Sequence, residues 1–247
     1  SRHSGSRGIS AVEHQAYFNR LLAGKPIIWQ DVTFTPTTID EIIEMGTDNF
    51  DRIFYPFALI ADSFKNAGDL SVFECIIRTP SVLADMMQGL KTLTAYNGSK
   101  LFSNRIELWW SGEKRRTLVI DKNNFDELAY LVCLMQGLHR QEQDKFRTYK
   151  DPKLNDAKNK ILQGRKRVAE KNAVHFCDML NICLWGGEYM VPRDIIMSMS
   201  MWELMNLYKN KVGIKNYNDE LRVAIASGDG KSVSGNNFWL ERVKIGT

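Results

Sequence analysis

The sequence has little of what marks a secreted, membrane-spanning or disordered protein. Four cysteines occur in 247 residues, too few for the disulfide framework of a small secreted domain. No run of about 18 apolar residues occurs, so we expect no membrane-spanning segment. Hydrophobic residues make up 44% of the chain, whereas disordered chains have few of them. The composition predicts a globular protein in a reducing compartment, with its cysteines buried as small apolar side chains.

Charge of one sign is also scarce, since the formal net charge is only +4. A dedicated nucleic-acid-binding protein usually carries a stronger and more focused basic excess. The excess that exists lies in residues 140–171, which hold eleven Lys or Arg and five Asp or Glu. Interspersed acids favour a solvated helix with ion pairs, so we do not expect nucleic acid as a partner. Phosphate contact by this tract is the alternative.

Motifs for a nucleotide or metal site fail on spacing. Residues 230–232 (Gly-Lys-Ser) look like the end of a phosphate-binding loop, but Ile225 stands where that loop needs its first glycine. His175, Cys177 and Cys183 could supply zinc ligands, yet residues two apart on a helix point in different directions. We therefore expect no cofactor, no metal and no enzymatic activity.

Hydrophobic periodicity predicts an α+β fold that is predominantly α-helical. Helices are expected at about 12–23, 39–45, 48–65, 70–78, 81–95, 125–139, 154–184, 192–210 and 216–226. The tract 154–184 is expected to break near Gly164 or around residue 172. Thr38 and Glu41 have the spacing of a capping box, Gly46 should end the helix that follows, and Pro56 should kink or divide its helix.

Two β elements are expected. Residues 25–34 predict one N-terminal strand in which Ile28, Gln30, Val32 and Phe34 share a face. Within residues of about 105–120, two apolar, β-branched and aromatic segments lie on either side of a charged segment. This pattern predicts a β-hairpin.

The composition along the chain suggests four regions. Residues 1–10 look like a cloning remnant, with no secretory signal after them, and residues 11–140 form an N-terminal α+β domain. Residues 141–190 form a basic helical connector, and residues 191–247 a C-terminal helical region.

The expected helix 192–210 carries more apolar side chains than one core-facing stripe can easily take. They are Met197, Met199, Met201, Trp202 and Met205. At helical spacing such residues usually belong to the core, but methionine-rich faces also adapt to varied partners. We expect Trp202 in the core and at least one methionine directed outward, toward a partner or a second copy of the chain.

Residues 21–27 (Leu-Leu-Ala-Gly-Lys-Pro-Ile) and 36–46 (Pro-Thr-Thr-Ile-Asp-Glu-Ile-Ile-Glu-Met-Gly) resemble the opening of a protein family of tailed phages from Gram-positive hosts. Later positions that look similar are 125–128, the basic tract 156–171 and the Trp-containing segment 202–208. These proteins look like tail-assembly chaperones.

The resemblance implies a non-enzymatic bacteriophage tail-assembly chaperone in the cytoplasm of the infected bacterial host. Such a protein would keep the long helical tape-measure protein soluble and bring tail-tube proteins to it by protein–protein interaction. It implies no catalytic residues and no membrane, and a homo-oligomer is compatible with it. The alternatives are a phage nucleic-acid-associated protein that uses the tract 140–171, and a virion structural component.

Overall fold

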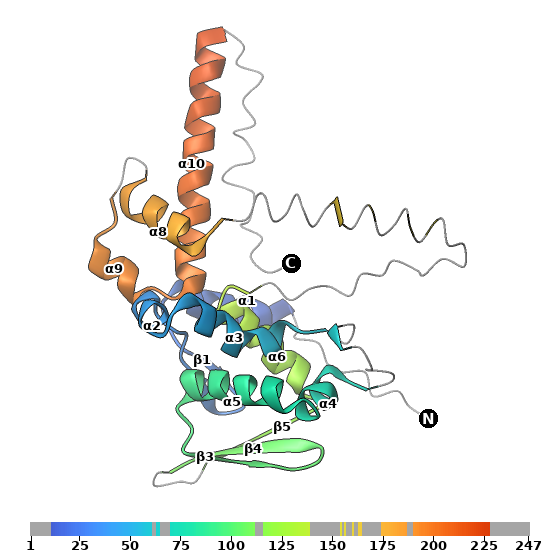
Figure 1. Cartoon of the computed structure of the whole chain (residues 1–247). Coiled ribbons are helices and arrows are strands. Elements are labelled where there is room, and N and C mark those ends of the chain that lie inside the picture. Colours follow the sequence, from blue (N-terminus) through green and yellow to red (C-terminus); the bar gives the residue numbers. More distant parts are fainter. Residues whose placement is uncertain are drawn as a thin grey trace.

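The protein has a mainly helical α+β fold, as the sequence predicts, and its strands form two small antiparallel sheets (Figure 1). The computed structural model describes residues 11–60, 63–64, 70–111, 116–138, 174–186 and 190–227, with residues 154, 156, 160, 163 and 164. The helices are α1 (Ala11–Leu22), α2 (Ile39–Met45), α3 (Thr47–Ala58), α4 (Val72–Ile77), α5 (Pro80–Thr94), α6 (Phe125–Met135), α8 (Phe176–Trp185), α9 (Arg193–Ser198) and α10 (Met201–Ser227). The strands are β1 (Ile27–Trp29), β2 (Val32–Phe34), β3 (Gly98–Leu101), β4 (Arg105–Trp110) and β5 (Arg116–Asp121).

The N-terminal β element is a hairpin, so the prediction of one strand over residues 25–34 is wrong. β1 and β2 pair antiparallel with Trp29 opposite Val32. Gln30 and Asp31 form the turn with φ angles of 47° and 61°, which the right-handed twist of a two-residue hairpin favours. The turn also changes which side chains face inward, because Trp29 is buried and Ile28 is exposed.

The second β element confirms the predicted hairpin at about 105–120. β4 pairs with β5, with Leu108 opposite Leu118, and β3 adds a third strand on the other side of β4. β3 escapes sequence analysis because Gly98–Leu101 shows no apolar alternation. Residues 112–115 of the charged loop lie outside the described residues.

Short-range hydrogen bonds set the predicted start and end of α2. The Thr38 hydroxyl accepts from the backbone N–H of Glu41, and the Glu41 carboxylate accepts from the N–H of Thr38 at 2.8 Å. Gly46 ends the helix at φ 85°, a conformation that glycine adopts at little cost. The same reciprocal pair, Ser71 with Glu74, begins α4. α3 contains Pro56 and ends two residues later, at Ala58, whereas the pattern predicted helix to about residue 65, kinked or divided at the proline.

The core lies where α3 crosses α5 and α6. At one point α5 approaches α3 so closely that a Cβ on Gly89 would lie 2.5 Å from the Ile53 carbonyl oxygen. Phe125 at the start of α6 packs against both Phe57 and Phe73. The same cluster of buried residues continues through Ile196, Trp202 and Leu204, so the beginning of α10 is anchored in the core.

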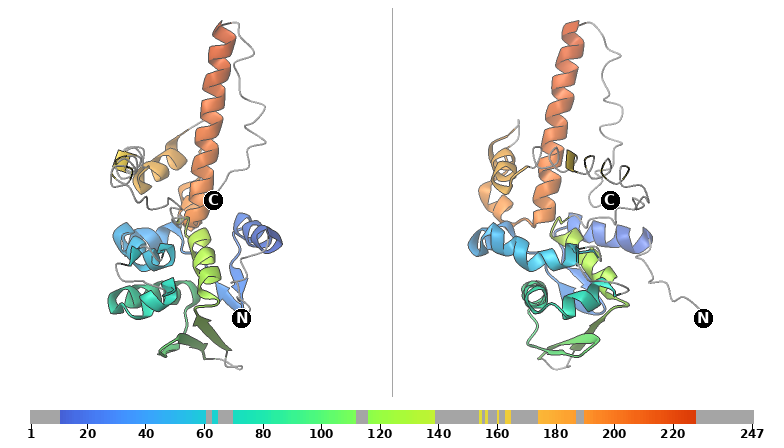
Figure 2. Two further views of the ribbon diagram at one scale, coloured as in Figure 1. Left: turned by 90° about the vertical axis from the view of Figure 1, so that its right-hand side faces the viewer. Right: turned by 45° about the vertical axis from the view of Figure 1, so that its right-hand side comes forward.

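Residues 192–227 form two helices with a break at Met199 and Ser200, and this differs from the predicted helices 192–210 and 216–226. The N–H of Ile39 donates to the carbonyl of Met199 at 2.8 Å, and Thr38 and Ser200 form a β-bridge. Beyond the break, α10 continues for 27 residues, about 40 Å at 1.5 Å per residue. Its distal half extends past α8 and away from the other described elements (Figure 1 and Figure 2).

Several predictions concern residues outside the described ranges. They include the cloning remnant 1–10, almost all of the basic tract 140–171 and the segment 230–232. The division into an N-terminal domain, a connector and a C-terminal region stays a prediction. Among the described residues, no helix has both the length and the apolar character that crossing a membrane requires.

Candidate functional site: the groove between α8 and α10

The five residues proposed as a partner-binding set lie at the junction of α9 and α10. Trp202 is fully buried, as predicted, and its indole meets the Phe18 ring edge-on at 5.2 Å between centroids. Met201 is also buried. Met197, Met199 and Met205 are partly buried and pack against the core. The junction therefore serves mainly to fix α10 to the body.

Two of these methionines have a specific packing partner at the end of α6. Gly137 has a φ of 64°, and a Cβ added there would collide with the Met205 sulfur and come within 3.3 Å of Met201 Cγ. The bare Gly137 backbone thus makes room for α10 to cross the end of α6. No partner is needed to explain the position of Met201 or Met205.

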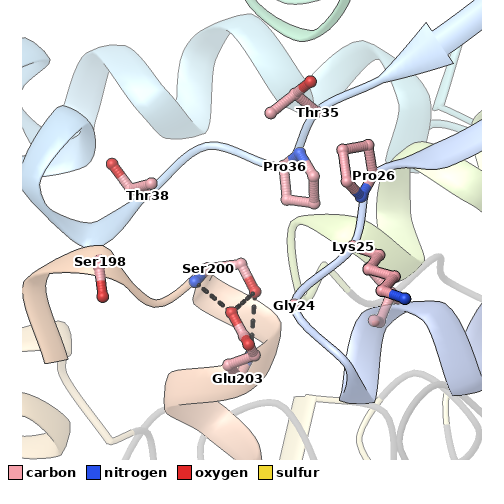
Figure 3. Close-up of a pocket in the computed structure, with 10 residues that line it drawn as sticks. Gly24, Lys25, Pro26, Thr35, Pro36, Thr38, Ser198, Ser200 and Glu203 are labelled. Carbon is pink, nitrogen blue, oxygen red and sulfur yellow. Dashed lines mark hydrogen bonds between the residues drawn. The ribbon is translucent and has the colours of Figure 1, made fainter. Parts of the chain in front are cut away.

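A small pocket lies beside the same junction (Figure 3). Its volume is about 120 Å³, and its lining includes Lys25, Thr38, Ser198, Ser200 and Glu203. The Glu203 carboxylate accepts from the N–H of Ser200 at 2.7 Å and from its hydroxyl at 2.9 Å. The Ser198 hydroxyl donates to the Ile195 carbonyl at 2.8 Å. These groups serve to begin and end helices, and the described residues that line the pocket include no histidine that could activate a serine.

A second hollow lies on the surface between α3 and α5. It has a volume of about 310 Å³ and is lined by Asp48, Asp51, Arg52, Tyr55 and Asp85, among others. Arg52 bonds Asp85 at 2.9 Å. Burial, and to a lesser degree the neighbouring Asp48, raises the pKa of the Asp51 carboxyl. Arg52 therefore already offsets part of the negative charge of this surface.

The largest of the three hollows is a groove of about 540 Å³ between α8 and α10. We call it the α8–α10 groove. Ile182 of α8 and Val212 and Ile214 of α10 give it apolar walls, and Lys215 and Arg222 add basic groups. The lining on α10 extends from Lys211 to Arg222, about three helical turns. This is the length and character of surface that holds the side chains of a partner helix.

Lys211 and Cys183 join the two walls of the groove. The Lys211 ammonium donates to the carbonyls of Cys183 at 2.8 Å and Gly186 at 2.7 Å. These carbonyls belong to the last turn of α8, where a cation is favourable. The Cys183 thiol points to the Leu204 carbonyl at 3.9 Å. Burial raises the pKa of this thiol, although Lys211 opposes the shift, so Cys183 is a packing group and a poor nucleophile.

The residues weighed as zinc ligands do not converge. Cys183 is fully buried, whereas His175 and Cys177 at the start of α8 are exposed. The expectation of four buried cysteines is thus wrong for Cys177. In the ranges that the structure describes, no group of three or more His, Cys, Asp or Glu side chains could hold a metal ion.

The α8–α10 groove cannot be predicted from the sequence of either helix alone, because it forms only where the two helices pack together. The one available signal was the face of α10 that Lys211, Lys215 and Arg222 share at four- and seven-residue spacing. That pattern is also typical of a solvated helix. Only the packing of α8 against α10 turns this face of α10 into one wall of a groove.

Comparison with models of known protein families, with curated proteins and with solved structures found no match to this chain.

Proposed function

We propose that this protein is a non-enzymatic, phage-encoded tail-assembly chaperone. In this proposal the α8–α10 groove holds an apolar helical segment of the tape-measure protein in the host cytoplasm, and the complex then receives tail-tube subunits. The observation that carries the proposal is the groove, with its apolar walls Ile182, Val212 and Ile214. The resemblance of residues 21–46 to phage tail proteins supplies the biological setting.

The geometry supports binding better than catalysis. In the described part of the chain, the hydroxyls and carboxylates beside the small pocket are engaged in helix ends, and the deepest thiol, Cys183, is buried. A groove with apolar walls and a basic side fits the general mode in which an amphipathic helix lays its apolar face into a hydrophobic cleft.

The test is co-expression with overlapping fragments of the tape-measure protein encoded beside this chain. We expect at least one fragment to stay soluble and co-purify only when this protein is present. Ile214→Glu should abolish co-purification because it places a charge in the groove. Val119→Glu on β5 is the matched control, since Ile214 and Val119 are both 38% exposed.

Two results would contradict the proposal. Salt-dependent DNA binding that requires residues 140–171 would point to a nucleic-acid-associated protein. Stoichiometric presence in purified particles would point to a virion component, because a chaperone leaves before assembly is complete.

A further inference from the structure

We infer that the α8–α10 groove selects an acidic amphipathic helix of a partner protein, one that packs an apolar stripe on Ile214 and Trp185 and directs carboxylates at Lys215 and Arg222. This inference names the chemistry of the ligand for the groove and so rests on the function proposed above. Its evidence is the arrangement of charge and exposed apolar surface around that groove.

The charge around the groove is unequal. Among the described residues that line the groove, three are basic, Lys211, Lys215 and Arg222, and one is acidic, Asp219. Lys211 is held by the two carbonyls of α8. Lys215 has no ion-pair partner among the described residues, and Arg222 reaches Asp219 only at 4.0 Å with most of its side chain exposed. Two cations are therefore available at the surface to a partner.

The available cations have a defined spacing. Lys215 and Arg222 lie seven residues apart on one side of α10, about 10 Å along the axis. Ile214 and Leu221 lie next to them with the same spacing and are 38% and 37% exposed. A helix alongside α10 would meet a row of apolar side chains with two positive charges along one side of that row. Carboxylates seven residues apart on that helix would match both cations.

Trp185 is an exposed aromatic side chain beside the groove, one residue before the lining residue Gly186. It is the last residue of α8 and is 68% exposed, although large aromatic side chains are usually buried. It lies three residues after Ile182, so the two share one face of α8, and Gly186 beside it lines the groove. Exposed Trp side chains next to a cleft are typical energetic centres of protein interfaces.

Charge complementarity favours an acidic partner over the chain's own C-terminal residues. The apolar segment 238–243 (Phe-Trp-Leu-Glu-Arg-Val) is neutral overall, and Lys244 follows it. A second copy would bring the same basic row of α10 against itself if the two helices packed groove to groove. Like charges placed opposite each other weaken such a pairing.

The experiment uses the full chain and three fluorescein-labelled helical peptides of 18 residues, designed for this test. The first has a Leu stripe flanked by Glu at seven-residue spacing. The second has Lys in place of Glu, and the third keeps the composition of the first but scrambles the stripe. Fluorescence anisotropy at low and at moderate salt gives each Kd. We expect only the first peptide to bind, more weakly at the higher salt.

Charge reversal makes the test specific. Lys215→Glu with Arg222→Glu should weaken binding of the acidic peptide by about tenfold or more and allow the Lys peptide to bind instead. Trp185→Ala should weaken the acidic peptide without this exchange. The control is Lys100→Glu with Arg116→Glu on β3 and β5, which changes the net charge equally and should leave the Kd unchanged.

Four results would overturn the inference. They are equal binding of the Glu and Lys peptides, equal weakening by the control variant, a dimer that Ile214→Glu dissociates, and tighter peptide binding on Trp239→Asp. The last two would identify a second copy or the chain's own C-terminal residues as the occupant. Peptide binding without capture of any tape-measure fragment would leave this inference standing and remove the proposed function. Capture without a charge preference would do the reverse.

Discussion

At the scale of single residues, Trp202 is the largest side chain that anchors the beginning of α10 in the core. Its side chain is fully buried, meets the Phe18 ring edge-on, and lies in the same core cluster as residues of α3 and α6. We expect Trp202→Ala to lower the free energy of unfolding by about 3–5 kcal/mol, because it leaves a large cavity. Trp202→Phe should cost less, since the indole N–H meets no acceptor in the described part of the chain. Denaturant titration measures both.

The proposed partner-binding methionines can be tested in the same way. Met197 and Met199 are less buried than Met201. If either contributes to a partner surface, its replacement by Glu should weaken association and leave the melting temperature within a few degrees of wild type. Unfolding by both substitutions would show that this junction is wholly structural.

Asp51 gives a prediction about pH. Burial raises its pKa, with a smaller contribution from Asp48, so the folded protein favours the protonated carboxyl more than the unfolded chain does. The cost to stability is therefore present above the folded-state pKa and absent below the ordinary value of about 3.9. Asp51→Asn should raise the melting temperature at pH 7, and the gain should vanish as the pH falls below 4.

Asp85→Asn is the control for that experiment. The Asp85 carboxylate bonds Arg52 at 2.9 Å, so its loss should not stabilise the protein at pH 7. A gain for Asp85→Asn as large as that for Asp51→Asn would show that general surface charge, and not the burial of Asp51, causes the effect.

At the scale of elements, the turn between β1 and β2 places one unfavourable residue, Gln30, in the left-handed region. Gln30 and Asp31 both have positive φ, where side chains other than Gly, Asn and Asp cost roughly 1–2 kcal/mol. Gln30→Asn with Asp31→Gly gives the sequence that such turns prefer and should stabilise the protein by about 1 kcal/mol. Thermal unfolding is the measurement. Asp31→Pro should destabilise instead, because proline cannot adopt positive φ.

The break between α9 and α10 has two causes, a helix-capping pair within the segment and a hydrogen bond from a distant element. Ser200 and Glu203 form a capping box, in which the Ser200 hydroxyl also accepts from the N–H of Glu203. Residues 200–203 (Ser-Met-Trp-Glu) have the spacing that indicates a helix start. The competing signal was the continuous apolar pattern of 192–210, which predicts one helix. The hydrogen bond from the Ile39 N–H to the Met199 carbonyl depends on where α2 packs. Hydrophobic periodicity within residues 192–210 cannot predict it.

At the scale of the whole molecule, Lys211 connects α8 to α10 and so maintains the groove. Its ammonium bonds the carbonyls of Cys183 and Gly186, and hydrogen bonds to a charged group contribute about 1.5–3 kcal/mol each. We expect Lys211→Met to speed amide hydrogen exchange in α8 by at least about tenfold. The core helices α3 and α5 should keep wild-type exchange rates.

Lys215→Met is the matched control, because Lys215 lies one turn further along α10 without these two bonds. Unchanged exchange in α8 for both variants would mean that Cys183 and the apolar packing alone hold α8 in place. Faster exchange throughout the protein in Lys211→Met would instead show that the groove and the core unfold together.

The sequence by itself determined the features that depend on residues a few positions apart. The Thr38–Glu41 capping box, the end of α2 at Gly46, the β4–β5 hairpin and the burial of Trp202 all follow from spacing that the chain displays locally. Only the tertiary structure decided the turn at Gln30, the added strand β3, the exposure of Cys177 and the groove between α8 and α10. In these cases the hydrogen-bond and packing partners come from other elements, as with Lys211 and the carbonyl of Cys183, 28 positions earlier. Periodicity records that a side chain is apolar or charged, whereas the free energy of its position depends on which element packs against it.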